Sequence, residues 1–317
     1  MISFRYHIVS IVSVFLALAV GVALGGGPLK GEVDNTLVDQ VHHDRVVTTG
    51  LRAQVTSLRK TNAFVDDFAA TAAPDLLGRS LRGHQVAVVV LPTAKQSDAA
   101  ALGRLVRVAG GRVTGTVLVG KQLLDAGRRQ LVDALGNQLQ NRDSGVRVAA
   151  DATPYERIGA LVARAIASRS AGGNRVDATA SGILAGLRAA NLLSAPKDLT
   201  RRGDLVLFVA GRGPSSPQQQ QGASSIVASL VATVDARSRG VVLAGPDPAA
   251  RGAGPVKAVR DDVSTARSVS TVDSLGRTAG QVVAVMALAG QAAGRSGHYG
   301  AVDAADGAMP GARPASR

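Results

Sequence analysis

The sequence contains no cysteine and no tryptophan, and only 3% of its 317 residues are aromatic. Without cysteine the protein has no disulfide bonds and offers no thiolate to a metal ion. With so few aromatic residues, its core must be built from valine, leucine, isoleucine and alanine. The sequence also lacks a basic stripe interleaved with aromatic residues, the pattern that stacks on single-stranded nucleic acid. We therefore expect no nucleic-acid partner.

Acidic residues are also few, since 23 aspartates and glutamates face 36 lysines and arginines and the net charge is +13. On an exported domain this surplus suits anionic partners such as lipid headgroups, acidic envelope polymers or an acidic protein surface. An arginine-rich and alanine-rich composition bias would produce the same surplus, so the charge alone does not identify a partner. The apolar content of 46% allows one or two domains with real cores.

One long apolar run stands at the N-terminus. Ile8–Leu24 carries no charge, and extension to Gly27 gives about 20 residues, the length that a helix needs to cross a bilayer. Arg5 precedes the run, which places the short N-terminal end in the cytoplasm and the rest of the chain outside. The alternative is a cleaved signal peptide, because Ala23-Leu24-Gly25 resembles a cleavage site. We predict a retained, single-pass cell-membrane anchor over residues 1–27.

Residues 28–76 are predicted to form one long helix with a narrow apolar stripe. Proline is absent from Glu32 to Ala73, and Pro74 is expected to end the helix. Alternating steps of four and three residues give a heptad seam, which Asp44 and Thr48 interrupt. We predict that this seam pairs two chains in a parallel coiled-coil homodimer; the alternative is a helix that folds back on its own globular domain. The predicted dimerisation seam consists of Leu37, Val41, Leu51, Val55, Leu58 and Val65.

From residue 80 to residue 292, apolar β-branched runs alternate with helical patterns. This alternation predicts an α/β class domain, with three layers and a mostly parallel sheet. A capping box at Thr153 with Pro154 behind it predicts one of the helix starts. The small-residue segment 293–317 is predicted to be a disordered tail. The predicted strands are Gln85–Leu91, Arg112–Val119, Gly145–Ala149, Asp204–Val209, Val241–Ala244 and an edge strand at Ser268–Asp273.

Residues that ligate metals are few and scattered. The five histidines include no i, i+4 pair on a predicted helix and no H-E-x-x-H motif. The methionines form no cluster either, although copper(I) prefers thiolate and thioether ligands. His42 and His43 are the metal-site candidates, because a two-chain coiled coil could bring copies of one of them together.

The sequence shows no catalytic constellation, and we expect no enzyme. Gly211-Arg212-Gly213 follows a strand at the place where α/β folds bind ligands. The prolines and glutamines behind it match neither G-x-G-x-x-G nor a P-loop, which favours a flexible, exposed loop over a nucleotide site. Ser215 and Ser216 lack a G-x-S-x-G context, and His84 stands alone. Four aspartates at or beyond strand ends read as solvated loop residues: Asp247, Asp261, Asp262 and Asp273.

Five stretches, in this order, resemble the actinobacterial MctB family: ISFRYHIVSIVSVFLALAVGVALG, AGGRVTGTV, VVLAG, SVSTVD and GHYGA. The resemblance implies a membrane span, an extracytoplasmic coiled coil and an α/β domain, together with a role in copper transport or copper homeostasis. The family includes SteB-like proteins, which implies an alternative role. In that role a dimeric septal adaptor acts with a SteA-like membrane partner to control peptidoglycan hydrolysis and cell separation. The resemblance transfers no ligand residues, so copper is implied as a ligand by the family alone.

The residues also bear on how such a protein would act on copper. One apolar span cannot enclose a pore without oligomerising, and continuous apolar strands lack the alternation of a membrane β-barrel. An indirect effect on copper, through envelope permeability or assembly, fits these residues as well as a conduit does. Three hypotheses follow: an envelope protein of copper homeostasis, a septal adaptor, and an enzyme with a degenerate α/β site, for which the sequence offers no support.

Overall fold

The computed structural model describes residues 4–26, 29–142 and 144–311, and for residue 26 and residues 29–39 it describes the backbone only. The chain divides into two compact units, Met1–Phe64 and Val65–Arg317. The long helix α2 runs through the boundary between them.

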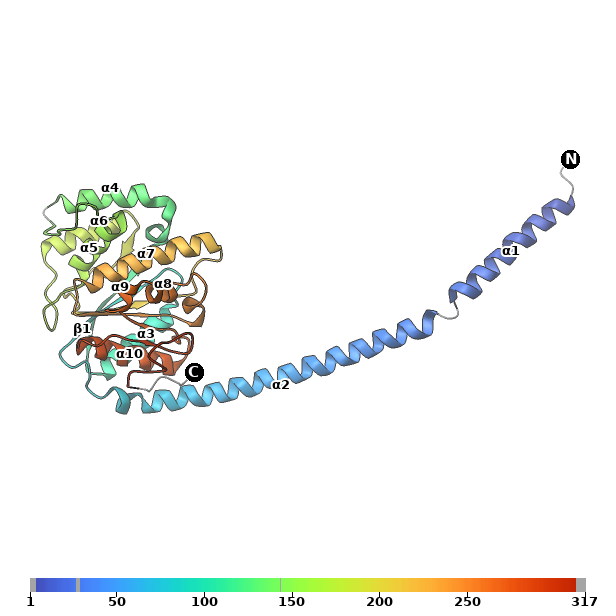
Figure 1. Ribbon diagram of the computed structural model, residues 1–317, viewed down its shortest axis with the longest axis horizontal. Coiled ribbons are helices and arrows are strands. Elements are labelled where there is room, and N and C mark those ends of the chain that lie inside the picture. Colours follow the sequence, from blue (N-terminus) through green and yellow to red (C-terminus); the bar gives the residue numbers. More distant parts are fainter. Residues whose placement is uncertain (1–3, 27–28, 143, 312–317) are drawn as a thin grey trace. The chain divides into compact units, whose positions relative to one another are not determined.

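The first unit contains α1 (Phe4–Gly26) and most of α2 (Leu29–Leu77) (Figure 1). Among the described residues, α1 is the one helix that is long and apolar enough to cross a membrane, with a mean hydropathy of 2.6. The predicted helix before Pro74 is confirmed, but Pro74 does not end it. The helix continues for less than one further turn, and Gly78 closes it in the left-handed conformation (φ +52°) by donating its N–H to the Pro74 carbonyl at 2.9 Å.

The second unit is built on a seven-stranded sheet with the order β3-β2-β1-β4-β5-β6-β7. Every neighbouring pair is parallel except β2 and β3. The predicted α/β class with a mostly parallel sheet is thereby confirmed. The strands are β1 (Gln85–Val90), β2 (Arg112–Val119), β3 (Leu193–Ser194), β4 (Leu205–Val209), β5 (Gly240–Ala244), β6 (Ser270–Val272) and β7 (His298–Tyr299).

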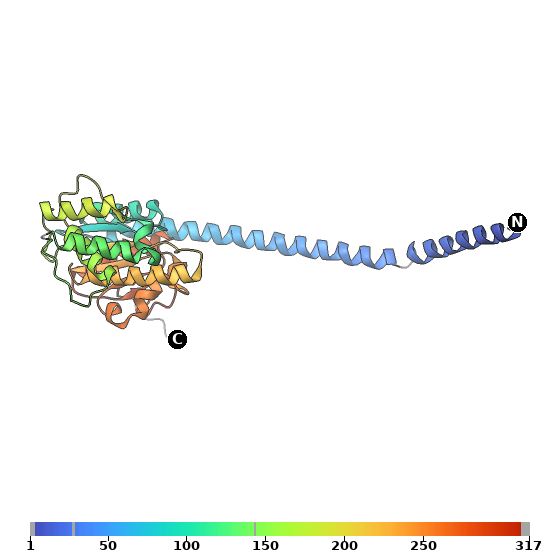
Figure 2. The same cartoon turned by 90° about the horizontal axis from the view of Figure 1, so that it is seen from above.

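Helices cover both faces of the sheet and complete three layers (Figures 1 and 2). Alternate residues of β1 enter two separate cores: Ala87 and Val89 lie in one, and Val86 and Val88 lie in the other. The first core is closed by α4 (Arg129–Gln140), α5 (Pro154–Ile166), α6 (Ala178–Ala189), α7 (Pro217–Asp235) and α8 (Pro255–Asp261). The second is closed by α3 (Gln96–Val108), α10 (Thr278–Ala292) and the end of α2. The short helices are η1 (Lys121–Leu124), η2 (Ala126–Arg128), η3 (Asp247–Ala250) and α9 (Val263–Ala266).

The capping box that opens α5 is confirmed. The hydroxyl of Thr153 accepts the N–H of Glu156 at 3.2 Å, and the Glu156 carboxylate accepts the N–H of Thr153 at 2.7 Å. Pro154 occupies the first helical position, where its missing N–H costs nothing. The box fixes the start of α5, whose apolar face is fully buried.

Several other local predictions are wrong. Residues 145–149 are irregular rather than a strand. Helix α7 begins at Pro217, within the glutamine-rich stretch that was expected to be a loop, because a proline at the first helical position is compatible with a helix start. Strand β6 is not an edge strand, because β7 pairs with it through Thr271 and His298.

The predicted disordered tail is also wrong for residues 293–311, which the structure describes. Tyr299 pairs with β6, and Val302 is buried. The guanidinium of Arg260 donates to the carbonyl of Val302 at 2.6 Å. The small-residue composition of this segment gave no sign of its ordered structure. Buried hydrogen bonds hold the segment in place more than the burial of apolar surface does. Residues 312–317 of the predicted tail lie outside the described residues.

Candidate functional site

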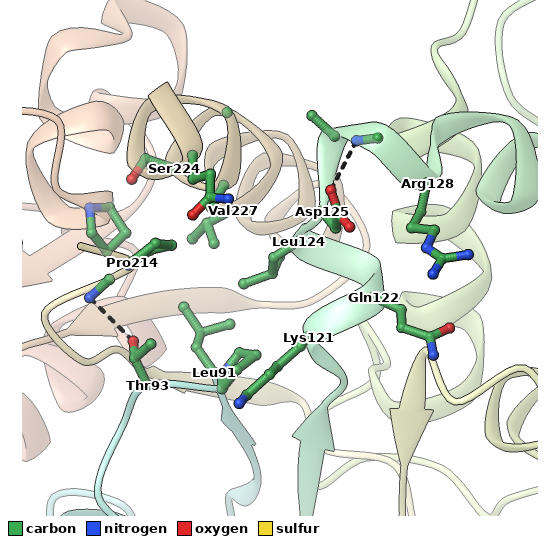
Figure 3. A pocket seen from close by; sticks show the side chains of 18 of the residues that line it. Leu91, Thr93, Lys121, Gln122, Leu124, Asp125, Arg128, Pro214, Ser224 and Val227 are labelled. Atoms are coloured by element: carbon green, nitrogen blue, oxygen red, sulfur yellow. Dashed lines mark hydrogen bonds between the residues drawn. The ribbon is translucent and has the colours of Figure 1, made fainter. Parts of the chain in front are cut away.

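A crevice of about 670 Å³ lies at the carboxyl ends of β1 and β4 in the second unit. The chain passes from β1 to β2 on one side and from β4 to β5 on the other, so this is the point at which the strand order reverses. Open α/β sheets bind ligands at such switch points. Four segments line the crevice: residues 91–93 after β1, residues 121–128 of η1 and η2, the loop into α7 with its first turns, and the start of α8 (Figure 3).

The floor of the crevice is apolar. Leu91, Leu124 and Val227 point into it from three different elements (Figure 3). Leu91 and Val227 are almost fully buried and also belong to the core beneath. Three prolines and the small side chains of α7 complete the apolar lining: Pro92, Pro214, Pro255, Gly222 and Ala223.

Several polar groups around the crevice have partners in the protein. The Thr93 hydroxyl accepts the N–H of Gly213 at 3.2 Å, and the Asp125 carboxylate accepts the N–H of Gly127 at 2.9 Å. The hydroxyl of Ser224 donates to the carbonyl of Ala253 at 2.6 Å. The side chains of Lys121, Gln122 and Arg128 have no hydrogen-bond or ion-pair partner among the described residues.

The glycine loop after β4 forms one wall of the crevice. A side chain at Gly211 is excluded, because a Cβ there would lie 1.9 Å from the carbonyl oxygen of Thr93. Gly213 has a φ of +88°, the left-handed region that favours glycine. The sequence located this loop correctly after a strand, at the carboxyl edge of the sheet, but the expectation that it is exposed is wrong at Gly211, which is buried against the loop after β1.

The predicted metal candidates are not brought together with other ligands. His42 and His43 are exposed on α2. His84 bonds the buried Asp204 carboxylate at 2.7 Å, at the amino end of β1 and β4, which is opposite to the crevice. Within the described part of the chain, no group of three histidine, cysteine, aspartate or glutamate residues could hold a metal ion. The described residues that line the crevice include no histidine or methionine, so its donor atoms do not suit copper(I).

The predicted seam on α2 is exposed to solvent in the single chain. The exposed fractions of Val41, Leu51, Val55, Leu58 and Val65 range from 41% to 61%. The side chain of Leu37 lies outside the described residues. Farther along the same helix, within the second unit, the side chains that face the domain are buried: Ala69, Ala73 and Leu77. Coiled-coil pairing through the seam remains a prediction.

A buried polar cluster was missed at the sequence level. Asp273, which we expected to be a solvated loop residue, is fully buried and lies 3.0 Å from the Arg260 guanidinium. Arg260 also donates to the hydroxyl of Thr271 at 2.8 Å and to the carbonyl of Tyr299 at 3.0 Å. The stretches SVSTVD and GHYGA thus meet in the β6–β7 pair. No local pattern signals a contact between residues so far apart, and the cluster has a structural role.

His298 belongs to the surroundings of this cluster. Its ring Nδ1 lies 2.9 Å from the hydroxyl of Thr271, and its backbone N–H donates to the carboxylate of Asp306 at 2.7 Å. Burial, followed by the nearby Arg260 charge, lowers the pKa of His298 below its ordinary value of 6.5. The neutral imidazole is therefore the form that the folded domain favours.

Comparison with known proteins gives one consistent result. A family model described as "Copper transport outer membrane protein, MctB" matches residues 1–310. The chain is 29% identical over 314 residues to "Copper transporter MctB" of Mycobacterium tuberculosis strain H37Rv, covering 95% of this chain and 96% of the relative. It is 29% identical over 308 residues to the protein of the same name from Mycobacterium leprae, with the same shares covered.

Proposed function

The chain belongs to the MctB family, and from this membership we propose that it is a non-enzymatic, membrane-anchored envelope protein that serves copper transport or copper homeostasis. The observation that carries the proposal is the extent of the family match, which includes the apolar helix, the long helix and the α/β domain. The name of the mycobacterial relatives supports the assignment of copper as the substrate.

The proposed topology is a single pass with the α/β domain outside the cytoplasm. Helix α1 supports an anchor, because its length and apolar composition match the bilayer core. Arg5 before the apolar run supports a cytoplasmic N-terminus.

We further propose that the protein acts on copper as an assembled envelope component rather than through a resident copper(I) site in its domain. The proposal is supported by the lack of soft copper(I) ligands, because the chain has no cysteine and the described residues that line the crevice offer only apolar and hard polar groups. Pairing of two α2 helices would bury the exposed seam, whereas His42 and His43 lie between the seam positions 41 and 44 and would face outward from the pair.

A copper titration tests the proposal that the domain holds no resident copper(I) site. Copper(I) is delivered from a competing chelator to the full chain in nanodiscs, and the His42→Ala/His43→Ala variant is compared with a His84→Gln control. We expect no submicromolar site in any of the three proteins. A submicromolar site that only the double variant abolishes would place copper on paired α2 helices. A site that survives the double variant would show that the fold builds a copper centre and would overturn the indirect role.

A cellular assay tests the function itself. A mycobacterial host that lacks its own MctB relative is grown at raised copper with or without this chain, and cell-associated copper is measured. We expect the chain to restore the copper content and growth of the parent strain. A chain that reaches the membrane at the normal level without changing either quantity would refute the proposal. The comparisons give no support to the septal adaptor, and we do not propose it.

A further inference from the structure

We propose that the crevice at the β1–β4 switch point binds an organic anion, a phosphate or carboxylate head on a flat apolar body. The proposal goes beyond the copper function, since the crevice offers no suitable copper ligands. It rests on the volume of the crevice, on its apolar floor and on the placement of unpaired positive charge at one side.

The volume and lining match a small-molecule site. Binding sites for small molecules measure roughly 300–1,000 Å³ and are mostly apolar with a few convergent polar groups. This crevice, at about 670 Å³, has Leu91, Leu124 and Val227 as its floor. Pro214 and Pro255 give flat walls, and such walls pack against a planar body.

Positive charge is available on the same side as the glycine loop. In Figure 3 the Lys121 side chain extends toward the side of the crevice formed by Leu91 and Thr93, while Arg128 extends away from it. Gln218 and Gln219 line the crevice from the first turn of α7, before Gln220 makes the first backbone bond to the Ser216 carbonyl at 2.9 Å. Their N–H groups therefore have no partner within the helix, and the positive end of a 19-residue helix dipole borders the same crevice as Lys121.

Among the described residues that line the crevice, Asp125 carries the one carboxylate. The carboxylate of Asp125 accepts the N–H of Gly127 and caps η2, and it forms no ion pair with Lys121. An anionic head can therefore be held by the Lys121 ammonium and the N–H groups of α7, while its apolar body covers the leucine and valine floor.

The test uses naphthyl phosphate as the probe. Inorganic phosphate and naphthol, which correspond to its anionic head and its apolar body, are the comparison ligands. Calorimetry is carried out on the full chain in nanodiscs of zwitterionic lipid, with empty nanodiscs as the reference. We expect saturable binding at one site per chain, about tenfold or more tighter than for either half. A further arm with dihexanoyl phosphatidate separates a lipid from a soluble source, because a lipid ligand would bind more tightly than the naphthyl compound.

Two variants assign the binding to the crevice. Lys121→Gln should weaken naphthyl phosphate about tenfold by removing the charge-assisted contact, whereas Lys197→Gln, an exposed lysine outside the crevice, should leave binding unchanged. Gly222→Leu should abolish binding, because a Cβ at Gly222 lies 3.5 Å from the Ala126 Cβ and a longer side chain would enter the crevice.

Gly222→Leu also guards against loss of fold, because leucine is favoured over glycine within a helix and the melting temperature should not fall. The proposal is overturned by an absence of naphthyl phosphate binding in the wild-type chain. It is equally overturned by binding that survives Gly222→Leu, by equal effects of the two lysine variants, or by phosphate or naphthol binding as tightly as the whole probe.

Discussion

Replacement of Asp273 by asparagine tests the buried cluster that holds the C-terminal segment. One carboxylate oxygen accepts the hydroxyl of Ser274 at 2.9 Å and the N–H of Ala301 at 2.7 Å. The other oxygen accepts the Arg260 guanidinium at 3.0 Å and the N–H of Val302 at 3.1 Å. Whichever oxygen becomes an amide nitrogen, two donors lose their acceptor and face a third donor. No rotation of the new side chain satisfies all four groups.

The size of the effect follows from burial. Asp273 is fully buried and the Arg260 side chain is 9% exposed, so Asp273→Asn leaves a buried guanidinium without its counter-charge. Breaking one side of a buried pair costs about 3–5 kcal/mol. A domain is stabilised by roughly 5–15 kcal/mol in all, so the loss is a large fraction of the total. With a slope of about 3 kcal/mol per molar urea, the unfolding midpoint should fall by roughly 1–2 M.

Pulse proteolysis of the full chain across a urea gradient measures this midpoint. The matched control is Asp303→Asn, because Asp303 is exposed in the same segment and asparagine tolerates its φ of +47°. The control should change the unfolding free energy by less than about 0.5 kcal/mol. If the two variants unfold at the same urea concentration, the cluster does not hold the segment and the reasoning is refuted.

Three further predictions concern the anchor, the long helix and pH. Cysteine at the exposed Ser97 should react with an impermeant reagent in intact, wall-permeabilised cells, and reaction only after lysis would reverse the topology. The double variant Leu51→Asp/Leu58→Asp should be a monomer where the wild type is a dimer, because burying an unpaired carboxylate in the seam costs several kcal/mol. Light scattering in detergent measures the oligomeric state. A wild-type chain that is monomeric at high micromolar concentration would contradict pairing through the seam. Because the pKa of His298 is lowered in the folded domain, the unfolded chain takes up this proton first, and stability should decline as pH falls below 6.5. In His298→Gln the melting temperature should fall less as the pH drops below 6.5, because the proton uptake by His298 is absent. A variant with the same pH dependence as the wild type would refute this role of His298.

The central strands could be predicted from the sequence because each is a continuous apolar run. The predicted Gln85–Leu91 and Arg112–Val119 agree with β1 and β2 to within one residue, and the parallel pairing follows from the helix between them. The two-residue strands β3 and β7 could not be predicted, because so short a pairing leaves no periodic pattern.

The crevice was only partly predictable. The place of the glycine loop, after β4 at the carboxyl edge of the sheet, could be predicted, since it follows from the α/β order alone. Its fixed conformation depends on Thr93, which lies 120 residues earlier in the chain. The place of Lys121 in the crevice could not be predicted, because a single surface lysine after a strand is common. It lies in the lining only because the segments after β2 and β4 meet there.

The pairing of β7 with β6 also sets the order in which the domain can be completed. Arg260 and Asp273 precede in the chain the groups that satisfy them, which lie at Tyr299 to Val302. Until those residues arrive, a guanidinium and a carboxylate lie at an open sheet edge. A chain translated or exported from its N-terminus therefore closes its sheet last, and a product that stops before residue 298 keeps an exposed, charged edge that proteases can recognise.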